Sequence, residues 1–167
     1  MNTDLPYKIA CLCYLFDEND NTLLLHRVKP PNRHLYSPIG GKLEQKIGES
    51  PADCAIREIQ EEAGVTLNHD QIHLTGIVSE TSYQNQTHWL MFLYEVKIPI
   101  SLKNMQCNEG KLEWFSKADL SKLDIPETDK TIIWPLFWKH RGGFFATHID
   151  CTQNPLKSRL DESCFLR

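Results

Sequence analysis

One helix can be bounded at both ends from its own residues, and it limits the possible folds more than any other segment. Ser50 is the expected N-cap, Pro51 suits the first helical position, and Gly64 is a typical C-terminal stop. The helix is therefore predicted over about residues 51–63. Apolar side chains recur along it at spacings of three and four, which predicts a stripe that packs against a sheet. These are Ala52, Ala55, Ile56, Ile59 and Ala63.

Three glutamates crowd onto little more than one turn of this helix. At about 100° per residue, Glu58, Glu61 and Glu62 share one face beside the apolar stripe. Like charges at such spacings repel by about 0.2–0.5 kcal/mol per pair, so either water screens them or a cation binds among them. The glycines at 40 and 41 end the preceding loop and permit close backbone approach. Carboxylates with a backbone carbonyl are the oxygen ligands that Mg²⁺ or Mn²⁺ prefers.

Apolar runs typical of β-strands lie on both sides of the helix. Residues 7–16 and 21–28 are predicted to be strands joined by the turn DENDN, and we expect them to pair antiparallel with each other. The segment 29–42 is rich in proline and glycine, which predicts a functional loop. Residues 73–83 and 87–98 are predicted to form a central hairpin of two long strands.

A second helix and a tail are predicted toward the C-terminus. The helix is expected over about residues 127–140, with Thr128 or Asp129 as its cap. Residues 141–167 have no helical periodicity and are expected to be an irregular tail. Within it, FFATHID (144–150) is compatible with an added edge strand.

The overall composition narrows the class of protein. A length of 167 residues with 41% hydrophobic content predicts a single globular domain, 1–167. A net charge of −4 and a pI near 6.0 offer no broad basic surface, so no polymeric nucleic acid partner is expected. The six cysteines lack C-x-x-C spacing, which favours free thiols in a reducing compartment. No membrane span and no secretory signal are recognised, so a cytoplasmic location is expected.

The segment 40–65, GGKLEQKIGESPADCAIREIQEEAGV, resembles the Nudix box, whose pattern is G-x5-E-x7-R-E-U-x-E-E-x-G-U with U aliphatic. From Glu49 onward every specified position agrees with the pattern. The one departure is two extra residues between Gly41 and Glu49, which we place within 45–47. The chain is thus similar to Nudix hydrolases of the MutT type. That resemblance implies an α/β/α sandwich with a mixed β-sheet and a loop-helix-loop metal site.

The resemblance also implies a reaction. Nudix hydrolases cleave a pyrophosphate bond in a nucleoside diphosphate linked to another moiety, with Mg²⁺ or Mn²⁺ as the cofactor. The expected substrate is an intact or oxidised nucleoside triphosphate that yields a monophosphate and pyrophosphate. ADP-ribose or another nucleotide sugar, and a dinucleoside polyphosphate, are alternatives. A sensor that binds small-molecule nucleotides without turnover is an alternative of another class, and either a monomer or a homodimer is compatible with the sequence.

Roles carried over by position in the box define the expected catalytic site. The metal ligands are expected to be the Gly40 carbonyl with Glu49, Glu58, Glu61 and Glu62. Arg57 is expected to orient a neighbouring glutamate through a charge-assisted hydrogen bond. The proton acceptor is not drawn from one fixed place in the family. Glu109, in the loop before a short strand ending at Trp114-Phe115, and Glu58 of the box are the two candidates.

Substrate-binding candidates lie outside the helix. Lys42 and Arg27 are expected to face phosphate oxygens, and Tyr83 to stack on a base, whereas Trp89 and Phe92 are expected in the core. MutT-type members read the purine edge from the loop before a C-terminal helix. Glu127 and Asp129 are therefore the base-reading candidates, with helix capping as the alternative role.

Overall fold

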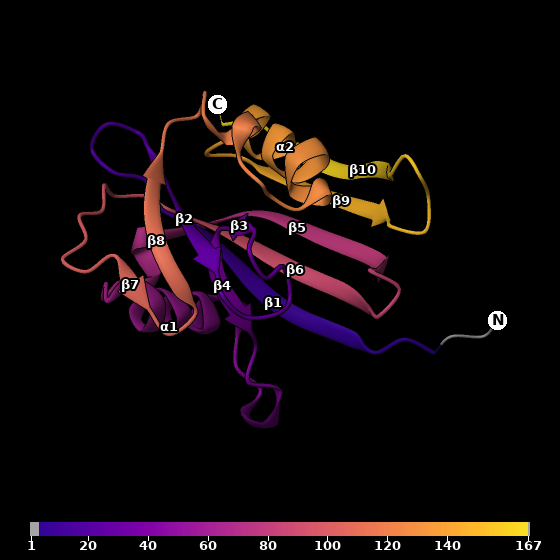
Figure 1. The fold of residues 1–167 in the computed structure, drawn as a ribbon, viewed down its shortest axis with the longest axis horizontal. Helices are drawn as coiled ribbons and strands as arrows, with labels where there is room; N and C mark the ends of the chain where they lie inside the picture. Colours follow the sequence, from indigo (N-terminus) through magenta and orange to yellow (C-terminus); the bar gives the residue numbers. More distant parts are fainter. Residues whose placement is uncertain (1–3, 167) are drawn as a thin grey trace.

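A six-stranded mixed sheet forms the centre of the molecule in the computed structural model, which describes residues 4–166 (Figure 1). The strand order is β10-β9-β5-β6-β1-β4. Two pairs, β1 with β6 and β5 with β9, are parallel, and the remaining pairs are antiparallel. The strands are β1 (Tyr7–Tyr14), β4 (Ile39–Lys42), β5 (Ile72–Tyr83), β6 (Thr87–Val96), β9 (Phe144–Asp150) and β10 (Lys157–Cys164). The predicted central hairpin, β5 with β6, is confirmed.

A second sheet of four short strands, in the order β3-β2-β8-β7, lies beside the first. Its strands are β2 (Thr22–Arg27), β3 (Tyr36–Ser37), β7 (Gln106–Cys107) and β8 (Gly110–Phe115). The predicted antiparallel pairing of residues 7–16 with 21–28 is therefore wrong. The turn does form, with the Asp17 carboxylate accepting hydrogen bonds from Asn19 and Asn21. Only one bridge, Phe16 to Thr22, follows it before the two strands enter different sheets.

The burial of β1 explains this separation. Cys13 and Tyr14 face opposite sides of the strand and both are fully buried, so β1 is covered on both faces. A strand buried on both faces is typical of the interior of a sheet. β1 pairs with β6 on one side and with β4 on the other. β2 consequently pairs with β3 and β8 instead.

The first predicted helix is confirmed with its caps. α1 spans Pro51–Ala63, the Ser50 hydroxyl accepts a hydrogen bond from the Asp53 amide, and Gly64 has a φ of 68°. α1 packs on β4 and β1. The two extra residues of the box loop fall where a 3₁₀ turn, η1 (Gln45–Ile47), has formed.

The second predicted helix also forms, from 127 to 139, but its middle is wound more loosely. A π-helical segment, η4 (Asp129–Ile133), is followed by α2 (Trp134–Lys139). No side-chain hydrogen bond caps η4, so neither Thr128 nor Asp129 has the predicted capping role. The remaining 3₁₀ turns are η2 (His69–Gln71) and η3 (Leu120–Lys122).

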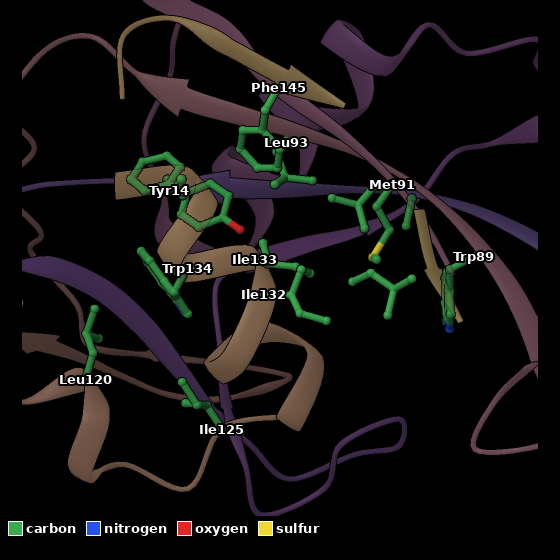
Figure 2. Close-up of a cluster of buried hydrophobic side chains, with 14 of the residues drawn as sticks. Tyr14, Trp89, Met91, Leu93, Leu120, Ile125, Ile132, Ile133, Trp134 and Phe145 are labelled. Atoms are coloured by element: carbon green, nitrogen blue, oxygen red, sulfur yellow. The ribbon is translucent and has the colours of Figure 1, made fainter. Parts of the chain in front are cut away.

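Two hydrophobic clusters lie on opposite faces of the central sheet and confirm the predicted α/β/α sandwich. Alternate residues of β1 enter each of them, with Cys11 and Cys13 on the α1 side and Ala10 and Tyr14 on the other. Figure 2 shows this second cluster, in which side chains of β6, β9 and the second helical segment gather in one interior. In the described residues, no helix is long and apolar enough to cross a bilayer.

The prediction of an irregular tail over residues 141–167 is wrong, because β9 and β10 form there. Phe145 and Ile149 of β9 are fully buried, and β9 pairs with β5 on one side and β10 on the other. FFATHID is thus an inner strand, and β10, which is exposed along its whole length, is the edge. Buried and partly buried residues alternate along β9 with the period of two that is typical of a strand and not of a helix.

Candidate active site

A cleft of about 520 Å³ opens between the loop that precedes α1, the central sheet and the start of η4. Its lining residues form two groups, because Glu62 has Glu58, Arg27 and Glu109 as neighbours, whereas Glu80 has Asp129 and Thr128. We call the first the glutamate end, and its charged lining residues are Glu58, Glu61, Glu62, Glu109, Arg27 and Lys42. We call the second the far end, and its lining residues are Glu80, Tyr83, Trp89, Met91, Thr128, Asp129 and Ile133.

The three box glutamates differ in their exposure. Glu58 and Glu62 are buried, whereas the side chain of Glu61 is 59% exposed. Burial raises the pKa of Glu62 to about 7, although the Gly40 amide donates a 3.0 Å hydrogen bond to its carboxylate. Burial also raises the pKa of Glu58, and the neighbouring Arg57 opposes that change. Glu58 and Glu62 are therefore held where burial disfavours the negatively charged form of their carboxyl groups.

Arg57 connects two glutamates of the box. Its Nε and Nη2 atoms donate to the two carboxylate oxygens of Glu49 at 2.7 and 3.0 Å, and Nη1 donates to Glu58 at 2.6 Å. The Glu44 amide also donates to Glu49, which does not line the cleft. Arg57 thus has the geometry expected for orienting Glu58. Both carboxylate oxygens of Glu49 are hydrogen-bonded to Arg57.

The carboxylates do not converge on one point as the side chains lie. Within residues 4–166, no group of three His, Cys, Asp or Glu side chains is arranged to hold a metal ion. Arg57 Nη1 lies 2.6 Å from a carboxylate oxygen of Glu58 and 3.6 Å from one of Glu61, while Glu62 accepts from the Gly40 amide.

The chemistry of the glutamate end nevertheless fits a hard divalent cation. All of its candidate donors are oxygens, and burial raises the pKa of Glu62 more than the charge of Arg27 and the Gly40 hydrogen bond lower it. A Cβ atom at Gly41 would overlap the Glu58 carboxylate, so this glycine leaves the space that the carboxylate occupies. Mg²⁺ and Mn²⁺ match this donor set.

Glu109 lies at the glutamate end, as predicted for a second source of a proton acceptor. Its carboxylate contacts Lys29 at 3.0 Å and Arg27 at 3.5 Å. Arg27 also donates to the Pro31 carbonyl at 2.9 Å. Lys42 lines the same end, and its carbonyl oxygen accepts a hydrogen bond from Arg57.

Two of the substrate-binding candidates reach the far end. Tyr83 lines it and donates a 2.6 Å hydrogen bond to the Asn32 side chain, and Asp129 lines it from η4. Glu127 is exposed and is not part of the cleft lining, so the structure separates it from the other candidates. Trp89 is buried in the core as expected, and it also lines the cleft. Phe92 packs against the α1-side core.

Four further residues line the cleft and were not predicted from the sequence, namely Asn32, Glu80, Met91 and Thr128. A signal for Glu80 does exist in the sequence. It follows Val78 by two positions in β5, so it lies on the buried face of a strand, where a charged residue is unusual. The other three gain their positions from segments that are distant in the chain.

The chain matches the family described as NUDIX domain over residues 6–134. It is 30% identical over 117 residues to the uncharacterized Nudix hydrolase YvcI of Bacillus subtilis, covering 69% of this chain and 70% of that protein. It is 29% identical over 119 residues to mouse diphosphoinositol polyphosphate phosphohydrolase 2, covering 70% of this chain and 61% of that protein.

The structure is similar to the crystal structure of the MutT protein from Bacillus halodurans. The TM-score is 0.72 at 28% sequence identity, and the alignment covers 92% of this chain and 97% of that one. The sequence match, the sandwich fold and the box glutamates in one cleft agree with one another. The chain therefore belongs to the Nudix family and is a Nudix pyrophosphohydrolase.

Proposed function

We propose that this enzyme uses Mg²⁺ or Mn²⁺ to hydrolyse a nucleoside triphosphate to a monophosphate and pyrophosphate. One observation carries the proposal. Three box glutamates line the same cleft as Tyr83, Trp89, Met91 and Ile133, so a diphosphate and a nucleobase can be held together. When bound, the divalent ion neutralises phosphate charge and activates water as the nucleophile.

Each residue of the glutamate end has a proposed task. Glu58, Glu61 and Glu62 hold the divalent ion together with the Gly40 carbonyl, and Arg57 fixes the direction of Glu58 through its 2.6 Å hydrogen bond. Glu49 supports Arg57 from the other side of the guanidinium. This arrangement limits the motion of Glu58, which is what preorganised catalysis requires.

Glu109 is the proposed proton acceptor. It lines the glutamate end on a segment separate from α1, and its carboxylate contacts Lys29 and Arg27. Glu58 is the alternative acceptor, although Arg57 occupies one of its oxygens. Comparison of pH–rate profiles for Glu109→Gln and Glu58→Gln distinguishes them, since only loss of the acceptor removes the acidic limb.

The phosphate and base contacts follow the two ends of the cleft. Lys42 and Arg27 are proposed to meet phosphate oxygens, and Tyr83 and Trp89 to contact the base. Asp129 is proposed to accept a hydrogen bond from the base edge, because its Oδ1 atom is buried and has no partner within residues 4–166.

A panel of nucleoside triphosphates, oxidised purine triphosphates, ADP-ribose and dinucleoside polyphosphates tests the proposal. Purified protein is assayed with Mg²⁺ or Mn²⁺ in ¹⁸O-labelled water, so that the products identify both the substrate and the attacked phosphorus. We expect Glu61→Gln to abolish hydrolysis without unfolding the protein, because Glu61 is exposed. The matched control is Glu162→Gln on exposed β10, which should retain activity.

Two results would contradict the proposal. If the wild-type protein binds nucleotides but cleaves none of the panel with either ion, a nucleotide sensor is the better reading. If ADP-ribose is cleaved and triphosphates are not, the proposed substrate is wrong, although pyrophosphate hydrolysis is supported.

A further inference from the structure

β10, yellow in Figure 1, is the outermost strand of the central sheet next to β9. All of its residues, Lys157–Cys164, are exposed, and within residues 4–166 its only partner strand is β9. An edge strand leaves a row of backbone N–H and C=O groups without a partner in the sheet. The backbone of β10 can therefore pair with one more strand.

The charges of β10 are separated by sign along the strand. Lys157 and Arg159 lie before Leu160, and Asp161 and Glu162 lie after it. Both basic residues and Glu162 share one face of the sheet, because their partners on β9 are alternate residues of that strand. Asp161 is the extra residue of a β-bulge. One half of the strand is thus positive and the other half is negative.

This arrangement is complementary to itself when two copies of β10 run antiparallel. An alignment centred on Leu160 brings the basic residues of each copy beside the acidic residues of the other, whereas a parallel alignment brings like charges together. Arg159 contacts Asp161 at 2.5 Å within one strand, but both side chains are exposed, so little is lost when they exchange partners. The charges therefore favour a pair with two-fold symmetry.

Apolar side chains on and directly after β10 favour the same pairing. Leu160 is 44% exposed, Phe165 is 54% exposed and Leu166 is 75% exposed. In the antiparallel alignment, Leu160 lies near the two-fold axis beside the same residue of the second copy. Residues 165 and 166 then extend toward the β9–β10 turn of that copy. Burial of these side chains adds a hydrophobic contribution to the backbone hydrogen bonds of the strand pair.

Charged residues and a bulge can instead protect an edge strand from pairing. That role requires charges that repel every incoming strand, whereas charges separated by sign repel a parallel strand and attract an antiparallel copy. A two-fold pair is also closed, because it uses the β10 edge of both copies. The opposite edge of the sheet, β4, is only four residues long. Pairing through β10 therefore stops at two copies.

We infer that β10 is the interface of a homodimer, in which a second copy of this chain adds its own β10 antiparallel and the two central sheets become one. The inference is independent of the proposed hydrolysis. One strand pair is a small interface, so a dimer is expected at about 100 μM protein and a monomer at about 1 μM. β10 is then exposed at the lower concentrations that suit kinetics and unfolding.

Sedimentation velocity of the full chain at these two concentrations tests the interface. Two variants give β10 a single sign of charge, namely Lys157→Glu with Arg159→Glu, and Asp161→Lys with Glu162→Lys. Each variant alone should stay monomeric at about 100 μM, because antiparallel copies then place like charges opposite each other. Mixed in equal amounts, the two variants should form a heterodimer.

The matched control is Lys97→Glu with Lys103→Glu, which changes the net charge as much as the acidic β10 variant does. Both positions are exposed and lie outside β10, so the control should dimerise as the wild type does. A wild type that stays monomeric at the higher concentration, or a dimer that either β10 variant retains, would overturn the inference. So would a mixture of the two variants that stays monomeric. If one variant fails to fold, the other still provides the comparison with the wild type.

Discussion

At the scale of single residues, Gly40 and Gly41 are adjacent in sequence but serve different purposes. Gly40 has a φ of 150°, and a Cβ atom there would overlap the Cys11 carbonyl of the neighbouring strand. A Cβ atom at Gly41 would instead meet the carboxylate of Glu58. The backbone cannot move aside cheaply, whereas the end of a glutamate side chain can. Gly40 is therefore needed for the packing of two backbone segments, whereas Gly41 leaves the space that the Glu58 carboxylate occupies.

This difference predicts opposite outcomes for two alanine substitutions. Gly41→Ala should displace Glu58 and reduce kcat by about tenfold or more with little change in Tm. Gly40→Ala should lower the free energy of unfolding by about 1–3 kcal/mol, because both the conformation and the space are unsuitable. Steady-state kinetics and urea unfolding of both variants check this. The interpretation fails if Gly41→Ala lowers Tm as much as Gly40→Ala does.

Glu80 predicts how stability depends on pH. Burial, with Asp129 nearby, raises its pKa from an ordinary 4.5 to about 8. Between these values the folded protein keeps a proton that the unfolded chain has released. Stability should therefore decrease as the pH rises from about 4.5 to 8 and then level off. Asp129, whose pKa burial raises to about 7, adds a change of the same sign.

Glu80→Gln should remove most of that loss. We expect the variant to exceed the wild type by on the order of 2–4 kcal/mol at pH 9 and to differ much less at pH 5. Urea unfolding at pH 5, 7 and 9 measures the slopes. Glu162→Gln, on the exposed strand β10, should retain the wild-type slope. A wild-type slope in Glu80→Gln would show that Glu80 is ionised without penalty.

At the scale of elements, α1 supports the carboxylates that we propose to be catalytic. It is held by its caps and by packing on β4 and β1, and one turn separates Cys54, buried in the core, from Glu58 in the cleft. Its buried side thus fixes the direction of its functional side. Fraying of the first turn would be transmitted toward Arg57 and Glu58.

Loss of the cap should therefore be measurable. Ser50→Ala removes the hydroxyl that accepts from the Asp53 amide at 3.1 Å and should destabilise the protein by about 1 kcal/mol. Ser158→Ala, at an exposed position of β10, is the matched control and should be neutral. Denaturant midpoints of the two variants provide the comparison. Equal midpoints would mean that tertiary packing alone defines the start of α1.

At the scale of the whole molecule, the chain after α2 completes the central sheet. β9 covers the edge of β5 and places Phe145 and Ile149 in the cluster beneath α2, while β10 covers β9 and remains exposed. The absent side chain at Gly76 leaves space for the Phe145 ring, which a Cβ atom there would approach to 3.0 Å. The two strands thus contribute very differently to stability.

Two truncations to alanine measure that difference. Phe145→Ala should cost about 3–5 kcal/mol because it leaves a cavity in a packed interior. Leu160→Ala, on the edge strand, should change the free energy of unfolding by no more than about 0.5 kcal/mol. Chemical denaturation of both proteins tests this. A small effect of Phe145→Ala would mean that β9 is not part of the cooperative core.

The sequence alone determined the features whose signals are local. α1, its caps and its cluster of glutamates depend on residues within a few positions of one another, and the β5–β6 hairpin depends on one short turn. The family pattern is local in the same sense. These features were predicted correctly because neighbouring residues suffice to specify them.

Only the tertiary structure decided what depends on distant partners. β1 and β2 separate because β1 is buried on both faces, and Glu80 meets Asp129 because a strand and a helix nearly fifty residues apart border one cleft. Burial then changes the chemistry of those carboxyl groups by withdrawing them from water. Such contacts cannot be recognised from the residue pattern of either segment alone, because they depend on how the layers of the fold pack together.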